Sequence, residues 1–231
     1  MDPDFLDAIY FYHGILEAYE IVGKELIGED VLEKHAIPRM VYYVKNFLPR
    51  EFKDKKEEEL TGELAKFLSD LKTKINSQEK FNVSLLEVWQ LRAAIFGYES
   101  AFLEILGDNV IKNYVLKRIP EILSLYLPQV FSAEDSTLKE KLQGFASYLK
   151  KQKFVKYANF SIKGGKVRFN VNHCAFAGIH DSDAYKQRKT RFCPWGMMVL
   201  AIVNAHEQKE FPIQSTTFAT KGTITQLQIF D

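Results

Sequence analysis

The spacing of hydrophobic residues changes once along the chain, near Lys153, and this change limits the possible fold more than any other feature. Before Lys153, apolar residues recur every three or four positions, which is the spacing of helices with one buried face. After it they alternate, which is the spacing of strands with one buried face. Helices first and paired strands last are typical of the α+β class, in which helices cover an antiparallel sheet. The sequence therefore predicts a helical N-terminal half packed on a C-terminal antiparallel sheet.

Helical spacing extends over most of the first half of the chain. The segments that show it are 5–23, 38–48, 51–80, 82–107, 108–131 and 132–154. Gly23 is expected to end the first of these helices, because glycine is common just after a helix. Pro38 is expected near the start of the second helix, and Pro120 is expected to break or kink the fifth.

The strongest helical signal covers residues 84–106. Ser84 and Glu87 have the spacing of a capping box, in which each side chain bonds to the other residue's backbone N–H. Gly107 is a suitable residue for the helix end. Apolar residues lie on nearly all sides of this helix, so we expect it to be central and covered on most faces.

The last third of the chain predicts two hairpins with a helix between them. One hairpin turns at Gly164–Gly165 and the other at Lys221–Gly222, because glycine tolerates the backbone angles of tight turns. Pro194 is expected at the first position of the intervening helix. The inward-facing candidates of the last strand are Ile224, Leu227 and Ile229. The order of elements is therefore strand, strand, helix, strand, strand.

The composition predicts no second, separately linked domain. No internal repeat and no linker rich in Gly, Pro or Ser interrupts the chain. We expect residues 1–82 to form an N-terminal helical segment that shares a core with an α+β ligand-binding domain at 83–231. A net charge of +1 indicates neither nucleic acid nor an anionic membrane as a partner. An acidic start, short apolar runs and two cysteines favour a reduced, cytoplasmic protein.

Three short sequences near the C-terminus, "NHCAFAG", "FCPWGMMVLAIVNA" and "FATKGTITQLQIF", place a cysteine at a hairpin end and another at a helix start. In this order they resemble the 4-vinyl-reductase-type (hydrocarbon-binding) domain, whose fold is shared with small transport-protein-particle subunits. The resemblance covers 154–231 and, more loosely, the helices from Ser84 onward. It implies a cytosolic module that binds or senses an apolar molecule in a cavity between helices and sheet. Family members often have more cysteines in the last hairpin, where this chain has Thr217 or Phe218, and Gln226.

Cys174, His180 and Cys193 are the candidate metal ligands. A strand end, the following loop and a helix start can converge on one zinc or iron ion, with His173 or Asp181 completing a tetrahedral set. Structural zinc sites usually contain close pairs such as Cys-x-x-Cys, whereas eighteen residues separate the two cysteines here. One alternative is that both thiols pack as small apolar groups in the core. Another is a disulfide between them, which a reduced cytoplasm disfavours.

A reactive thiolate is a further alternative at Cys193. This residue precedes a predicted helix, where the helix dipole lowers the pKa of a thiol. His173 or His180 is the candidate base for nucleophilic catalysis. The neighbouring Phe192 and Trp195 predict burial, which acts in the opposite direction and raises the pKa.

A run of basic residues occupies the loop "DAYKQRKTRF", at Lys186, Arg188, Lys189 and Arg191. Such a loop beside an apolar cavity can hold the carboxylate or phosphate of an amphipathic ligand, and arginine can do so with two parallel hydrogen bonds. The alternative is a solvated surface loop. The residues expected to contact a ligand are Trp89, Phe96, Lys186, Arg188, Arg191 and Trp195.

These observations favour a cytoplasmic protein that binds or senses a small apolar or amphipathic molecule, as a monomer or a homodimer. Burial of apolar area would supply most of the affinity, and the basic loop would set the ligand's orientation. The alternatives are a protein–protein scaffold and a metal- or thiol-dependent enzyme. Neither nucleic acid nor membrane is expected as a partner, and no catalytic residue is assigned.

Overall fold

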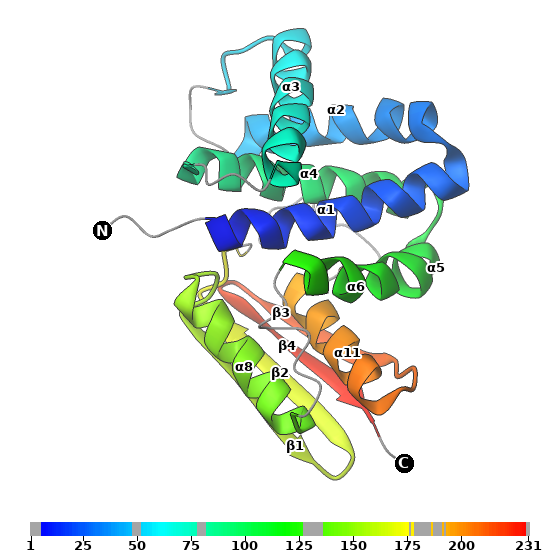
Figure 1. The fold of residues 1–231 in the computed structure, drawn as a ribbon, viewed down its shortest axis with the longest axis vertical. Coiled ribbons are helices and arrows are strands. Elements are labelled where there is room, and N and C mark those ends of the chain that lie inside the picture. The colour runs from blue at the N-terminus through cyan, green and yellow to red at the C-terminus, as the bar shows by residue number, and fades with distance from the viewer. Residues whose placement is uncertain are drawn as a thin grey trace. The chain divides into compact units, whose positions relative to one another are not determined.

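The computed structural model describes residues 6–47, 52–77, 82–126, 136–175, 177, 186, 191 and 193–229. The elements in chain order (Figure 1) are α1 (Leu6–Ile27), α2 (Glu29–Phe47), α3 (Glu57–Asn76), α4 (Leu85–Ile105), α5 (Asp108–Val110), η2 (Ile111–Val115), α6 (Leu116–Tyr126), α8 (Leu138–Lys151), β1 (Tyr157–Lys163), β2 (Lys166–Asn172), α11 (Pro194–Glu207), β3 (Ile213–Ala219) and β4 (Gly222–Gln228).

The chain divides into two compact units, Met1–Arg118 and Ile119–Asp231. The described part of the first unit is helical, and the second contains a four-stranded antiparallel sheet. The α+β class predicted from the sequence is therefore confirmed. The predicted domains 1–82 and 83–231, and the packing of the helical half on the sheet, stay predictions.

Helix α4 is the central element of the first unit, where it packs against both α1 and α2. Its capping box is confirmed: the Ser84 backbone N–H donates to Glu87 Oε2 at 2.7 Å, and the Glu87 N–H donates to Ser84 Oγ at 3.2 Å. Gly107 follows the end of the helix with a φ of 79°, as expected for a glycine stop. Most of α4 is buried, which agrees with apolar residues on nearly all its sides.

Two helix boundaries in the first unit differ from the prediction. Helix α1 continues through Gly23 and ends at Ile27, just before Gly28, whose φ is 82°. Gly23 serves packing instead, because a Cβ there would lie 2.6 Å from the side chain of Leu32. Helix α2 starts well before Pro38 and continues through it, since buried residues on both sides hold it against α4. Tertiary packing thus overrides the local signals of both residues.

The helix predicted to break near Pro120 is irregular upstream of that residue. The stretch Ile111–Val115 is π-helical, and α6 continues through the proline to Tyr126. Both Ile111 and Val115 are buried. Residues four apart lie on the same face of a helix, so both side chains point to the inner side of the unit.

The sheet of the second unit has the strand order β1-β2-β4-β3. The first hairpin turns at Gly164 and Gly165, both with positive φ, as predicted. The second turns at Thr220 and Lys221, one residue earlier than predicted, and β4 begins at Gly222. Glycine is required there because an added Cβ would lie 2.9 Å from the Cα of Asn172 on β2.

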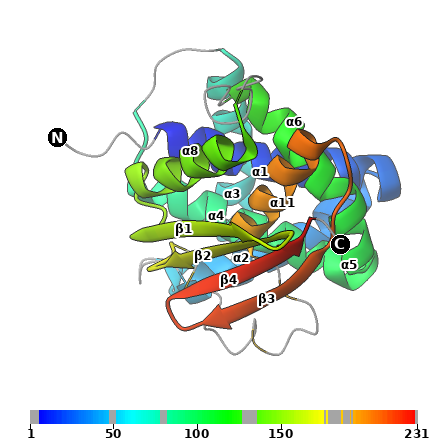
Figure 2. The ribbon, with the colours of Figure 1, turned by 90° about the horizontal axis from the view of Figure 1, so that it is seen from below.

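Helices α8 and α11 cover one face of this sheet (Figure 2). The strands turn alternate residues toward them, and Val167 pairs with Leu227 while Phe169 pairs with Thr225. This register makes Leu227 a core residue and puts Ile224 on the opposite face, where it is only half-buried. The prediction that Ile224 points inward is therefore wrong, whereas Leu227 and Ile229 are buried as expected.

Candidate functional site

The two cysteines lie at the junction of β2, α11 and β4 in the second unit. Both are buried, and they form no disulfide with each other. Cys174 follows β2, and its backbone N–H donates to the carbonyl of Lys221 at 3.0 Å. Its Sγ accepts a hydrogen bond of 2.9 Å from Nε1 of the fully buried Trp195, whose ring stacks on Phe154. The cluster therefore ties the end of one strand to the first turn of α11.

Cys193 is the N-cap residue of α11, and Pro194 occupies the first helical position as predicted. The Cys193 Sγ lies 2.9 Å from Thr223 Oγ1 on β4. Burial raises the pKa of Cys193, and hydrogen bonds from Thr223 and from nearby backbone groups oppose this effect only in part. The thiol thus stays neutral, so the geometry does not favour the reactive thiolate.

The metal site proposed at Cys174, His180 and Cys193 stays a prediction, because His180 and Asp181 lie outside the described residues. Within the part of the chain that the structure describes, no group of three or more His, Cys, Asp or Glu residues is placed to hold a metal ion. Both sulfur atoms already have hydrogen-bond partners in Trp195 and Thr223.

His173 is the candidate fourth metal ligand or catalytic base predicted from the sequence. It is exposed, with a φ of 53°, in the left-handed region that non-glycine residues seldom adopt. Its ring lies 5.9 Å from the ring of Tyr157 at the start of β1, and its backbone N–H donates to Asn172 Oδ1 at 2.8 Å. The structure thus places His173 at the surface, beside an exposed aromatic ring.

Arg191 stands at the end of the basic loop, just before α11. It is half-buried, and its guanidinium carbon lies 4.6 Å from the ring centroid of Phe218 on β3. A cation this close to an aromatic face forms a cation–π contact. Lys186 is exposed, and Arg188 lies outside the described residues. Arg191 is therefore the basic-loop residue whose surroundings are defined.

Trp89 and Phe96, the other predicted ligand contacts, belong to the first unit. Phe96 is fully buried, and its ring centroid lies 5.7 Å from that of Tyr43 on α2. Trp89 is half-buried. Phe96 thus takes part in the packing of α2 on α4, and a ligand-binding role for either residue stays a prediction.

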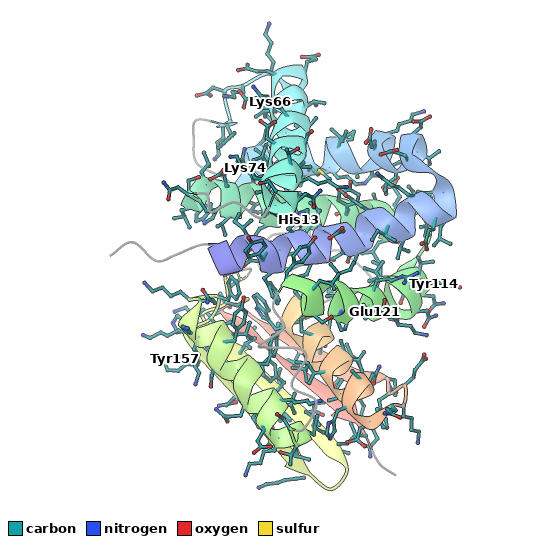
Figure 3. All side chains as sticks on the ribbon, in the orientation of Figure 1. His13, Lys66, Lys74, Tyr114, Glu121 and Tyr157 are labelled. Carbon is teal, nitrogen blue, oxygen red and sulfur yellow. The ribbon has the colours of Figure 1, made fainter. Side chains whose placement is uncertain are left out.

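An open groove of about 270 Å³ lies in the first unit, between α3 and the start of α4. Two of its lining residues, Lys66 and Lys74, are labelled on α3 in Figure 3. Its lining residues are Glu63, Lys66, Phe67, Asp70, Leu71, Lys74 and Glu87. Because most of these side chains are charged, the groove does not have the apolar character predicted for the ligand cavity.

Buried titratable groups cluster on α1 and its neighbours in the first unit. His13 Nε2 lies 3.8 Å from Glu17 Oε2, and Glu20 lies between Lys72 of α3 and the hydroxyl of Tyr98 of α4. Burial lowers the pKa of His13, although Glu17 acts in the opposite direction. Burial also raises the pKa of Glu20, with Lys72 opposing it.

The buried His13 predicts a pH-dependent stability. The unfolded chain takes up a proton near the ordinary histidine pKa of 6.5, whereas folded His13 takes it up only at lower pH. Stability should therefore fall as pH drops below about 6.5, by no more than about 1.4 kcal/mol per pH unit. The His13→Gln variant should lose this component, as measured by urea unfolding at several pH values.

The control for this prediction is His206→Gln, which removes a more exposed imidazole at the end of α11. The raised pKa of Glu20 has the opposite effect on stability, because it stabilises the folded state as pH falls. This contribution is present in wild type and in both variants, so it does not affect the comparison. Identical pH profiles for wild type and His13→Gln would contradict the prediction.

The sequence does not indicate a site role for several residues that surround the two cysteines and Arg191. Thr223 and Thr225 are buried on β4, and Thr225 Oγ1 lies 3.4 Å from Thr216 Oγ1. Phe218 is the ring beneath Arg191. If buried and exposed residues alternate strictly along β4, counting back from Leu227 places both Thr225 and Thr223 on the inner face. Nothing in the sequence paired Arg191 with Phe218, because the contact depends on where β3 lies relative to α11.

Comparison with known proteins identifies no relative: no protein-family model, no curated protein and no solved structure matches this chain. In the described residues, no helix is both long and apolar enough to cross a membrane. Functional inference therefore depends on the geometry of the chain itself.

Proposed function

We propose that the second unit binds a small amphipathic anion beside the start of α11, at the β3 edge of its sheet. The proposal keeps the ligand-binding function and the 4-vinyl-reductase-type resemblance expected from the sequence. It also keeps the cytoplasmic location and the possible homodimer. It assigns no reaction, because burial raises the pKa of the Cys193 thiol.

The observation that carries the proposal is the contact between Arg191 and Phe218. The half-buried guanidinium, 4.6 Å from the ring, offers a positive charge next to an apolar surface. A carboxylate, sulfonate or phosphate would bind the guanidinium through charge-assisted hydrogen bonds. The apolar part of the same ligand would bury area against Phe218 and the adjoining chain. Lys186 and Arg188 would add positive charge to the same loop.

The first experiment is native mass spectrometry of the full chain purified from cells without denaturation. A retained small molecule that is lost on denaturation would support the proposal. The second is a fluorescence titration with anilinonaphthalene sulfonate, an aromatic anion of the proposed chemical class. The Arg191→Gln variant should bind this probe at least about tenfold more weakly, because a charge-assisted hydrogen bond contributes roughly 1.5–3 kcal/mol.

The matched control is Lys209→Gln, which removes a comparable cation at the other end of α11. Lys209 Nζ lies 5.5 Å from the ring of Phe211. This variant should bind the probe with an affinity within about twofold of wild type, since the surface there lies outside the proposed site. Equal affinities for wild type and Arg191→Gln would refute the proposed site.

A further inference from the structure

The positive charge of this protein is concentrated in one part of the second unit. Residues 138–172, which form α8, β1 and β2, contain nine Lys and Arg residues and a single acidic residue, Glu140. The whole chain has 31 Lys and Arg against 30 Asp and Glu, so the remainder is net acidic. All of the nine except Lys141 are exposed. A net charge near zero thus conceals a strongly basic surface.

The sheet face opposite α8 and α11, here called the outer face, is polar and bears no acidic residue in its described strands. The pairing register determines its members, which alternate with the core residues. They are Tyr157, Asn159, Ser161, Lys163, Lys166, Arg168, Asn170, Asn172, Ser215, Thr217, Ala219, Gly222, Ile224, Gln226 and Gln228. Figure 2 shows both helices of this layer on the other side of the sheet.

Three cations lie together at the Gly164–Gly165 end of the outer face. Lys163 is directly opposite Lys166 across the hairpin, and Arg168 follows on β2. Like charges directly opposite each other destabilise a sheet. No ion pair joins any of the three to an acidic residue in the described part of the chain. An anion bound at this end would offset their repulsion.

The other end of the outer face has an aromatic ring in place of cations. Tyr157 (Figure 3) is 53% exposed, and its ring lies 5.9 Å from that of the exposed His173. Between the two ends, Asn159, Asn170 and Gln226 offer amide donors and acceptors on the same face. Cations for phosphates, amides for base edges and an aromatic ring for stacking are the groups with which antiparallel sheets bind single strands.

We propose that the outer face binds single-stranded nucleic acid, with phosphates at Lys163, Lys166 and Arg168 and a base stacked on Tyr157. An anionic membrane fits this face less well, because insertion needs exposed apolar side chains. The apolar members here are Ala219 and the half-buried Ile224. The proposal replaces the expectation, based on the charge of the whole chain, that nucleic acid is not a partner. It is independent of the anion site at Arg191.

The test is fluorescence anisotropy of the full chain with a labelled twelve-nucleotide oligouridylate and oligothymidylate. The triple variant Lys163→Gln, Lys166→Gln, Arg168→Gln should bind at least about tenfold more weakly than wild type at moderate salt. With three phosphate contacts, the slope of log affinity against log salt should be about −2 for wild type and nearer zero for the triple variant. Arg191→Gln should bind these oligonucleotides as wild type does.

The matched control removes the same charge from the helical side of the unit. The triple variant Lys139→Gln, Lys150→Gln, Lys151→Gln changes exposed residues of α8, which lies on the opposite face of the sheet. It should weaken binding by less than about threefold, since only long-range attraction is lost. Equal losses in the two triple variants would show unspecific attraction and would overturn the proposal.

Stacking is tested separately at Tyr157. Tyr157→Leu should weaken binding about tenfold, whereas Tyr157→Phe, which keeps the ring, should retain it. Unchanged melting temperatures will show that these surface variants are folded. Failure to bind either oligonucleotide would overturn the proposal. So would binding to phosphatidylserine vesicles without binding to oligonucleotides, because that outcome identifies a membrane surface.

Discussion

Replacing Trp195 by alanine is expected to lower the free energy of unfolding by about 3–5 kcal/mol. The side chain is fully buried, its ring centroid lies 5.3 Å from that of Phe154, and its Nε1 donates to Cys174. Alanine would leave a large cavity and would remove the hydrogen bond that Nε1 donates to the Cys174 sulfur. Urea unfolding followed by circular dichroism measures the loss without depending on tryptophan fluorescence.

Two further variants test this assignment. Trp195→Phe keeps one aromatic ring but removes the N–H donor and part of the buried volume, so its cost should exceed the roughly 1 kcal/mol of the hydrogen bond alone and stay below that of Trp195→Ala. Trp89→Ala removes a half-buried tryptophan of the first unit and should cost less than Trp195→Ala. In Trp195→Ala, Cys174 should also react faster with a thiol reagent. A loss below about 1.5 kcal/mol would contradict the packing described for this junction.

The second large effect is expected at Gly97, where α4 crosses α2. A Cβ at this position would lie 2.8 Å from the backbone nitrogen of Met40 and 3.0 Å from its Cα. Backbone atoms cannot move aside as a flexible side chain can, so Gly97→Ala must separate the two helices. We expect a loss of about 1–3 kcal/mol in the free energy of unfolding.

The control for Gly97 is Gly144→Ala on α8, where an added Cβ would meet no atom within 4 Å. Alanine is favoured over glycine in a helix by about 0.5–1 kcal/mol, so this variant should be more stable than wild type. The two substitutions are chemically identical and should have opposite signs. If Gly97→Ala also stabilised the protein, α2 and α4 would not be in close contact at this crossing.

Local signals predicted those elements that depend on near neighbours in the chain. The capping box of Ser84 and Glu87, the turn at Gly164–Gly165 and Pro194 at the start of α11 are all present. In each case the interaction involves residues at most a few positions apart. Such features form because backbone donors and turn geometries are satisfied locally.

Signals whose meaning depends on a distant partner were misread. Glycine is common at helix ends, but Gly23 lies inside α1, where its missing side chain makes room for Leu32. Ile224 is strongly apolar, yet the pairing of β4 with β2 assigns its position to the outer face and gives the inner positions to Thr223 and Thr225. A change of register by one residue would move every side chain of the strand to the other face of the sheet. The register is therefore set by the strand as a whole and can place a single apolar residue on the outer face.

The candidate sites follow the same division. The sequence identified Cys174, Cys193 and Arg191 as candidate site residues. It did not indicate that Thr223 on β4 contacts Cys193, or that Phe218 on β3 contacts Arg191. It also contained the basic segment 138–172, although the balanced charge of the whole chain concealed it. The outer face became evident only when the register placed Lys163, Lys166 and Arg168 on one side.

The sequence by itself determined the class of this protein, the order of its elements and most of its caps and turns, because these depend on periodicity and on bonds between near neighbours. The tertiary structure decided where α1 ends and where α2 begins, which residues of β4 are buried, and which charged residues share a face of the sheet. Those properties depend on contacts between segments far apart in the chain. Their energy is set by close packing and strand register, neither of which a local pattern contains.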